Sequence, residues 1–490
     1  MAQLIRTSAP DFNFPVSGQR FLGLVVLLVA LGHDARALPS DGTPSNSAQV
    51  CASFGNEFDA STDVHAFKEY GAAVAQLLQQ GDFEKLDCIA DAARSNKTTF
   101  AGGMPQLHVF YRGLSNIDGH TTEEDWKDRI AELERWVSAS PESVTARVAL
   151  AKAYVNYAWN ARGEGFNDTV SDSGWRLFEE RLAKAKSILD EASALPSKCP
   201  EWYVTMQQVA QGQGWDLDEF TALFEQARAF DPAYYYNYRV LPDYLLPKWS
   251  GKDGAASKFA EESADRVGGT EGDILYFQIG AALVCGCDEQ AEFNRMSWPR
   301  LHKGYAELEK KYGSSMVNLN SLALMAVSYG DSEVGDAAFK RIGQQWDKDT
   351  WITEDYFNQS KVGAAARLAS WRAAQARAHV WVEEAAANLQ SPKGPQYKLA
   401  VEQAFAPFML QCEKDAGKGE EKVEFMLKMG PDGGVDDLFT PHPYQTPLAN
   451  CLVTNLWHSH VKHETPFPPP PHPDYWLTLD LDPAAPIAAK

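Results

Sequence analysis

Apolar residues recur three and four positions apart over much of the chain, which places them on one face of an α-helix. The clearest case is a pair of successive segments, Leu319-x-x-Leu322-Ala323-x-x-Ala326 and Gly335-x-x-x-Phe339-x-x-Ile342. Parts of the same pattern lie at residues 150–154 with 185–192, and at 224–232. Small residues let two helices approach closely, so the spacing predicts helical hairpins. Because one hairpin cannot bury its apolar face alone, we expect several to stack into one curved array.

The pattern changes after residue 390. The segment Ser391-Pro392-Lys393-Gly394-Pro395 combines two prolines with a glycine, which predicts a linker outside any helix. Residues 422–429 and 435–439 are predicted as two strands joined by a turn at 430–434, with a helix over 447–458 and a closing strand over 475–481. The predicted fold class is therefore mainly α. A helical-repeat solenoid over 38–390 is followed by a linker and connecting helix over 391–409 and a small α+β domain of ββαβ order over 410–490.

An apolar run at residues 21–31 follows two arginines and precedes the small-x-small triplet Ala35-Arg36-Ala37. This order is typical of a secretory signal peptide, with cleavage expected after Ala37. A helix of that length reaches roughly 16 Å, about half of the ~30 Å hydrocarbon core of a bilayer. We therefore expect a signal peptide over 1–37 and a periplasmic or secreted mature protein without a transmembrane span.

The cysteines add to this picture because disulfides form by default in an exported chain. The chain has seven cysteines, and an odd number leaves one thiol free or bridged to another chain. A bridge between Cys412 and Cys451 would close a loop of about 39 residues and add on the order of 4 kcal/mol in the chain-entropy model. Cys51 and Cys88 are expected to tie the N-terminus to the first helix pair. The CxC at 285–287 is a weak redox signal, and one outside partner plus one buried thiol is the plainer interpretation.

Charge excludes some partners. The formal net charge is −21, from 45 Lys and Arg against 66 Asp and Glu. Nucleic acids and anionic lipid surfaces are bound through clustered Lys and Arg, so both are poor partners for such a surface.

Catalytic chemistry has little support in the sequence. It contains no Gly-rich phosphate loop, nucleophile elbow, zinc-helix motif or acidic calcium loop. Histidines are densest at 458, 460 and 463, near 442 and 472, but positions two apart on a helix diverge by roughly 200°, which favours solvated side chains over a zinc site. We therefore assign no catalytic residue, cofactor or metal ligand.

Two regions are candidates for binding a partner. The insertion at 158–175 interrupts a repeat and carries Trp159, Arg162 and Trp175, and such loops often project onto a binding face. The alternative is a buried Arg162 that pairs with Glu179 or Glu180. Aromatic residues are dense over 202–249, where Tyr235 and Trp249 are expected to line a groove. Core filling is the alternative there, although the four tyrosines of 234–238 cannot all face inward from one helix.

Residues 80–350 resemble the bacterial "domain of unknown function 4034" family. The resemblance rests on Phe83-x-x-Leu86-Asp87, Leu107-x-x-Phe110-Tyr111-x-x-Leu114, Pro141-x-Ser143-x-x-Ala146-Arg147, Tyr157-Ala158-Trp159-x-Ala161-Arg162-Gly163, Pro200-x-Trp202-Tyr203, Gly214-Trp215 and Leu245-Leu246-Pro247-Lys248-Trp249-x-Gly251. It implies a tetratricopeptide-like helical fold and no activity.

The tail, residues 410–485, resembles the C-terminal domain of TonB-type energy transducers through Gly430-x-Asp432-Gly433-x-Val435 and Phe467-Pro468-Pro469-Pro470. The chain departs from TonB in lacking a spanning anchor and a long Pro-rich arm.

These observations predict a non-catalytic, exported helical-repeat protein that binds a protein or peptide partner in the bacterial cell envelope. Solenoids expose extended surface, and the tail offers an edge strand. The alternatives are a cell-wall hydrolase with its cleft at the Trp159–Trp175 loop, which a perturbed carboxylate or histidine beside Arg162 would favour, and a TonB-like transport component, which needs an uncleaved leader.

Overall fold

The computed structural model describes residues 46–117, 121–163, 165, 167–249, 251–284, 290–416, 423–440, 448, 451–452 and 467–481. The expected signal peptide, the CxC at 285–287 and the histidines at 442, 458, 460 and 463 lie outside these residues.

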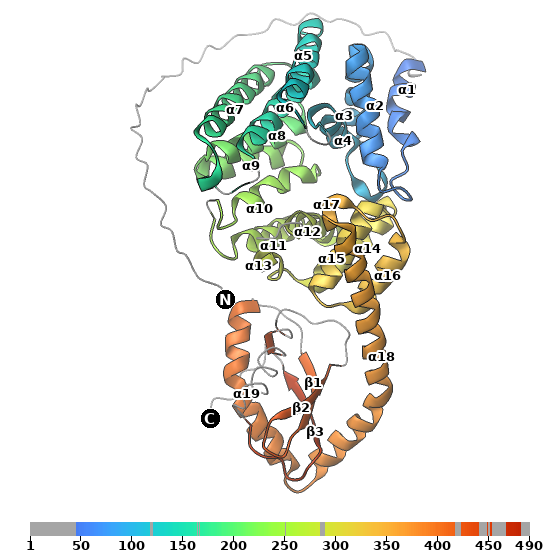
Figure 1. The fold of residues 1–490 in the computed structure, drawn as a ribbon, viewed down its shortest axis with the longest axis vertical. Helices are drawn as coiled ribbons and strands as arrows, with labels where there is room; N and C mark the ends of the chain where they lie inside the picture. The colour runs from blue at the N-terminus through green and yellow to red at the C-terminus, as the bar shows by residue number, and fades with distance from the viewer. Residues whose placement is uncertain are drawn as a thin grey trace, which may run out of the picture. The chain divides into compact units, whose positions relative to one another are not determined.

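Most of the described residues between 46 and 390 are helical, as the periodicity predicts (Figure 1). The α-helices of this part are α1 (Asn46–Ser53), α2 (Ala66–Gln80), α3 (Phe83–Asn96), α4 (Gln106–Ser115), α5 (Glu123–Ala139), α6 (Val144–Arg162), α7 (Asp172–Ser193), α8 (Pro200–Gln213), α9 (Leu217–Phe230), α10 (Val240–Tyr244), α11 (Ala255–Val267), α12 (Gly269–Leu283), α13 (Gln290–Phe293), α14 (Trp298–Tyr312), α15 (Met316–Ser328), α16 (Ser332–Ile342), α17 (Lys348–Trp351) and α18 (Glu354–Gln390). Short 3₁₀ helices join them at η1 (Phe54–Glu57), η2 (Ala101–Gly103), η3 (Asn167–Thr169) and η4 (Tyr235–Tyr238).

The hairpin of α15 and α16 shows how the spacing forms this fold. Its predicted apolar positions are buried, among them Leu319 and Phe339. Asp331 caps α16 by accepting a hydrogen bond from the backbone N–H of Val334 at 3.0 Å. A Cβ atom at Gly335 would lie 3.7 Å from the Cβ of Ala326, an ordinary van der Waals distance, so any small residue at this position lets the two helices meet.

The helical array does not stay open, which differs from the expected curved solenoid. Its first and later helices meet, because the backbone N–H of Met316 donates to the carbonyl of Ala60 at 3.0 Å. The side chain of Asn318 donates to the carbonyl of Gly102 at 2.8 Å. Gly102 has φ 77°, and a Cβ there would lie 2.4 Å from the Cβ of Ser315, so only glycine fits this contact. Figure 1 shows α14 and α15 beside the segment that follows α3.

The C-terminal part is a small antiparallel sheet with one helix on each face. Helix α19 (Gly394–Ala416) precedes strands β1 (Val423–Met429), β2 (Val435–Phe439) and β3 (Tyr475–Leu481), which lie in the order β2-β1-β3. The strand predictions are therefore confirmed. Of the helix predicted at 447–458, the described residues 448 and 451–452 are helical.

Alternate residues of these strands pack on opposite helices. Phe425 and Leu427 pack with Val401 and Phe405 of α19. Met426, Phe439 and Trp476 pack with residues of α18, where Trp381 stacks on Trp476 at 4.5 Å between ring centroids. The core of the tail therefore includes the second half of α18.

The expected linker is shorter than predicted. Helix α18 ends at Gln390 and α19 begins at Gly394, so Gly394 and Pro395 start a helix. Proline suits the first turn of a helix because its missing N–H has no intrahelical partner there. The domain boundary after residue 390 stays a prediction, but apolar contacts of α18 cross it.

Both predicted cysteine pairs are confirmed. Cys51 and Cys88 form a disulfide that joins α1 to α3, and Cys412 and Cys451 form one that joins α19 to the helical residues at 451–452. Cys199 is a free, buried thiol. No helix among the described residues is long and apolar enough to cross a bilayer.

Candidate binding cavity

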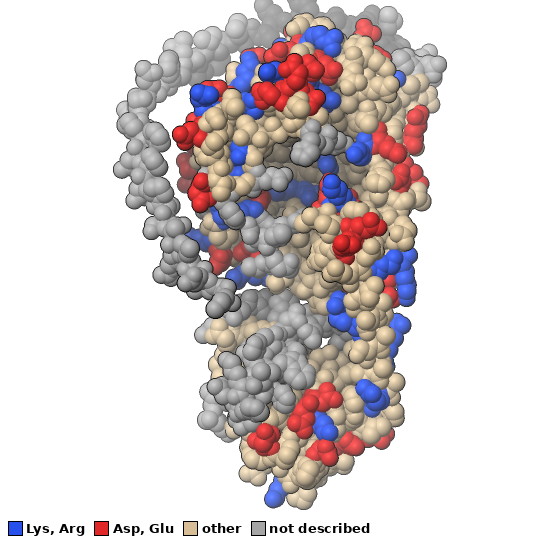
Figure 2. Space-filling model, viewed as in Figure 1, with Lys and Arg blue, Asp and Glu red and all other residues tan. Residues whose placement is uncertain are grey.

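The helices that meet in this closed array surround a cavity of about 580 Å³, within the range of ~300–1,000 Å³ typical of ligand sites. Its wall comes from the end of α3 and the loop after it, the start of α8, η4 with the end of α9, helices α11 and α12, and the end of α14. Figure 2 shows the surface hollowed at this level of the helical part, with Lys and Arg side chains on the wall.

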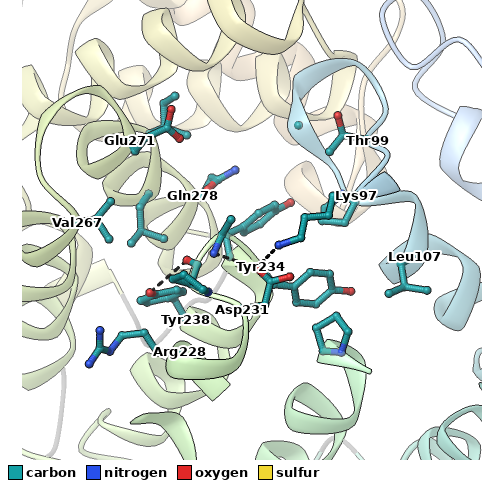
Figure 3. Close-up of a pocket in the computed structure, with 18 of the residues that line it drawn as sticks. Lys97, Thr99, Leu107, Arg228, Asp231, Tyr234, Tyr238, Val267, Glu271 and Gln278 are labelled. Carbon is teal, nitrogen blue, oxygen red and sulfur yellow. Dashed lines mark hydrogen bonds and ion pairs between the residues drawn. The ribbon is translucent and has the colours of Figure 1, made fainter. Parts of the chain in front are cut away.

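The lining is basic, although the chain is acidic. Its charged residues are Arg94, Lys97, Arg228, Arg266 and Lys311 against Asp231 and Glu271. Figure 3 shows Lys97 and Asp231 pointing toward one another from the two sides of the cavity, and their Nζ and Oδ1 atoms lie 3.0 Å apart. Lys311 pairs with Glu271 at 2.6 Å. The two acidic groups of the lining are thus each paired with a lysine of the lining.

Tyrosines form one part of the wall. Tyr234, Tyr235 and Tyr238 line the cavity, and all four tyrosines of 234–238 are buried. Our expectation that they could not all face inward is wrong because they lie on a 3₁₀ turn rather than on one α-helix. Tyr235 and Tyr236 donate to the Met104 sulfur at 3.5 and 3.1 Å, while Tyr238 packs on Phe224.

A buried ionic cluster holds this tyrosine wall in place. Glu201 of α8, with 0% of its side chain exposed, accepts hydrogen bonds from the Tyr234 hydroxyl at 2.6 Å and from Lys152 of α6 at 2.8 Å. The His108 ring of α4 lies 3.1 Å from the same carboxylate and stacks on Tyr236. One carboxylate therefore joins α4, α6, α8 and the wall of the cavity.

Burial and charge shift the pKa values of this cluster in opposite directions. Burial would raise the pKa of Glu201, but the charges of Lys152 and His108 outweigh it and lower that pKa to about 2. Burial lowers the pKa of His108 to about 4, against the opposing effect of Glu201. At neutral pH the cluster therefore contains an ionised Glu201 and a neutral His108.

Four of the five predicted binding residues gather in a second place, which we call the tryptophan cluster: Trp159, Arg162, Trp175 and Trp249. The Arg162 guanidinium carbon lies 5.5 Å from the ring centroids of both Trp159 and Trp175. The rings of Trp159 and Trp249 meet edge to face at 5.9 Å. The sequence groups Trp159, Arg162 and Trp175 in one insertion, and the structure adds Trp249, which we expected beside Tyr235. Tyr235 lies in the lining of the cavity instead.

The two interpretations of Arg162 can now be compared with its contacts. Its Nη1 atom donates to the carbonyls of Gly163 and Gly165 at 3.1 and 3.2 Å, so it shapes its own loop. Glu180 is exposed and pairs with Arg176 on its own helix at 3.9 Å. The hydrolase alternative expects a carboxylate or histidine with a shifted pKa beside Arg162. The strongly shifted pKa values described above belong to Glu201 on α8 and His108 on α4.

Metal chemistry gains no support within the described ranges, where no group of three or more His, Cys, Asp or Glu side chains is arranged to hold an ion. The charged residues of the cavity were missed by sequence reasoning because they are spread from residue 94 to residue 311. The one local signal was the run of tyrosines at 234–238.

The described residues form a mainly helical protein with a cavity between its helices and a small C-terminal sheet. No protein-family model and no curated protein matches the chain. Among solved structures, the crystal structure of the yeast Tom70 is similar over 73% of this chain and 69% of that chain, with 13% sequence identity and a TM-score of 0.33.

Proposed function

We propose that this protein is a non-catalytic binding protein whose helical part takes up a segment of a protein or peptide partner in the cavity. The observation that carries the proposal is the cavity itself, which is walled by tyrosines and basic side chains from helices far apart in the chain. Tyrosine offers large, rigid contact area with a polar end, a combination enriched where proteins bind one another.

The burial of the ionic cluster supports binding over catalysis. Glu201 and His108 have strongly shifted pKa values, which is a feature of many catalytic groups. However, both are buried and hydrogen-bonded to each other, and Glu201 also holds Lys152 and Tyr234. These contacts give the cluster a structural role that fixes the wall, rather than a reactive group presented to a substrate.

We place the protein in the periplasm or outside the cell, in the bacterial envelope. The apolar run at 21–31 supports export, and the disulfides Cys51–Cys88 and Cys412–Cys451 are compatible with an oxidising compartment. N-terminal sequencing of the exported protein tests this proposal. A mature start at Leu38 supports it, and an intact leader would favour the TonB-like alternative.

Selection from a library of random peptides tests the binding function. Ala233 is exposed and lines the cavity, so Ala233→Trp fills the cavity without disturbing the core. Ala366→Trp, on the exposed face of α18, is the matched control. We expect selected peptides to bind the wild type and the control equally and to lose affinity for Ala233→Trp. Peptides that bind all three proteins alike would refute the cavity as the site.

The tryptophan cluster is proposed as a second contact with the partner. Trp159→Ala and Arg162→Ala should each weaken binding by roughly 1–3 kcal/mol, the range for truncating Trp and Arg anchors. For Arg162→Ala the free energy of unfolding should change little, because Arg162 donates to the backbone of its own loop. A large loss of stability at unchanged affinity of the folded protein would assign the cluster to the core instead.

A further inference from the structure

We propose that the cavity holds an oxyanion of its ligand, a carboxylate or phosphate group carried by the bound peptide, between the guanidinium groups of Arg228 and Arg266. This inference rests on the proposed function, because it specifies the chemistry of the segment that the cavity binds. Such a site is unexpected in a chain with a formal charge of −21.

The charges of the lining point to these two arginines. Asp231 and Glu271 are each paired with a lysine of the lining. The acidic partners of the arginines lie outside the lining, because Arg94 pairs with Asp91 and both Arg228 and Arg266 pair with Glu225. The carboxylates that pair with the arginines of the wall are therefore not part of the lining.

Glu225 holds the two arginines as a pair. Its Oε2 atom accepts hydrogen bonds from Nε and Nη2 of Arg228 at 2.9 and 2.5 Å, and its Oε1 atom accepts one from Nη1 of Arg266 at 2.8 Å. Arg228 lies in the last turn of α9 and Arg266 in the last turn of α11, so one carboxylate joins two helices.

Donors remain for a ligand. A guanidinium has five N–H donors in a planar fork. Among the residues that the structure describes, Glu225 is the single hydrogen-bond acceptor of both groups. The side chains of Arg228 and Arg266 are 33% and 50% exposed, so a ligand can reach them. Two guanidiniums and one carboxylate leave a local charge of about +1, which one anionic group would neutralise.

The rest of the cavity indicates what the anion is attached to. Figure 3 places Arg228 and Val267 at one side of the cavity and Leu107 at the other. Pro105 and Pro200 lie with Leu107 in the lining, and Tyr234 stands between the two sides. A ligand that satisfies both sides has an anionic group followed by an apolar body, as in a peptide with an acidic or phosphorylated residue beside apolar residues.

The plain alternative is that both arginines only stabilise the C-terminal ends of their helices. Cations in the last turn interact favourably with the helix dipole, and this needs no ligand. Small probes separate the two roles because benzoate and phenyl phosphate carry an oxyanion on an apolar ring, while benzamide has the same shape without the charge.

The experiment titrates the full chain with each probe by calorimetry, for the wild type, Arg228→Gln, Arg266→Gln and the control Arg176→Gln, an exposed arginine of α7 outside the lining. We expect benzoate or phenyl phosphate, or both, to bind better than benzamide. Each cavity variant should lose about tenfold or more of that affinity, the loss expected when a charge-assisted hydrogen bond is removed, and the control should lose none. Phosphate and carboxylate sources are distinguished by which anion binds more tightly.

Equal binding of benzamide and the anions, or anion binding that both cavity variants retain, would overturn the inference. Thermal melts of the variants show that each is folded before titration. The peptides selected against the cavity separate this inference from the proposed function. Peptides blocked by Ala233→Trp yet bound equally by the arginine variants overturn the oxyanion site alone. Anion binding that depends on the arginines, without any peptide blocked by Ala233→Trp, overturns peptide binding alone.

Discussion

Removing the carboxylate of Glu201 should lower the free energy of unfolding by a large amount for a single substitution. In Glu201→Ala, the ammonium of Lys152, whose side chain is 4% exposed, keeps its burial but loses the carboxylate 2.8 Å away. The Tyr234 hydroxyl loses its acceptor as well. Leaving one buried charge without its partner costs about 3–5 kcal/mol, against a total of about 5–15 kcal/mol for a typical domain.

A double variant tests whether the unpaired charge is the cause. In Glu201→Leu with Lys152→Met, both charges are replaced by apolar groups of similar volume, and such replacements are often neutral or stabilising. His108 is neutral at pH 7 because burial lowers its pKa to about 4, so it adds no new buried charge. We therefore expect the double variant to recover about 2 kcal/mol or more of the loss in Glu201→Ala.

Urea unfolding at pH 7 without reductant, followed by tryptophan fluorescence, measures both effects. Glu180→Ala is the control, because its exposed pair with Arg176 should contribute only about 0–1 kcal/mol. The reasoning fails if Glu201→Ala stays within about 1 kcal/mol of the wild type, or if the double variant is as unstable as the single one.

Three further outcomes are expected. The pKa of His108 is lowered by burial from 6.5 to about 4, so between these pH values the unfolded chain binds more protons and stability falls as the pH falls. His108→Gln should remove about 3 kcal/mol of this pH-dependent loss in unfolding free energy, measured by urea unfolding across that pH range. Replacing Cys51 and Cys88 by serine should cost about 4 kcal/mol for a loop of their spacing, measured in the same way, and an unchanged midpoint would contradict it. A fragment of residues 391–490 should expose apolar surface and bind a hydrophobic dye, because it lacks the part of α18 that covers Met426, Phe439 and Trp476. A fragment of residues 366–490 keeps that part and should fold. A well-folded short fragment would refute this.

The sequence predicts those features of the fold that depend on neighbours in the chain. The hairpin of α15 and α16 follows from apolar residues three and four apart, and β1 follows from alternation along seven residues. The two disulfides are predicted from the positions of their cysteines beside predicted elements, together with the expected export. The closure of the array cannot be predicted in this way. Gly102 and Ser315 are more than 200 residues apart in the chain, and no local pattern around either residue indicates that they meet.

The candidate sites divide in the same way. Trp159, Arg162 and Trp175 lie in one insertion, so sequence reasoning groups them, and the structure adds Trp249. The basic residues of the cavity come from separate parts of the chain. In the sequence, each of them looks like an ordinary cation exposed to solvent. We expected that the tyrosines of 234–238 could not all face inward from one α-helix. They lie in and next to a 3₁₀ turn, where side chains point in other directions than in an α-helix, and all four are buried.

The contrast between the acidic chain and its basic cavity bears on what the protein selects. Within about one Debye length of the surface, roughly 8–10 Å, an approaching anion is repelled by a chain with a formal charge of −21, and farther away salt screens this repulsion. Inside the cavity, Arg228 and Arg266 are the nearest charges and dominate. A polyanion such as a nucleic acid must keep most of its charges outside, where they remain repelled, because the cavity neutralises few of them. A segment with one anionic group beside apolar residues gains the local attraction and carries little charge to be repelled, so the charge distribution favours short, weakly charged segments over polyanions.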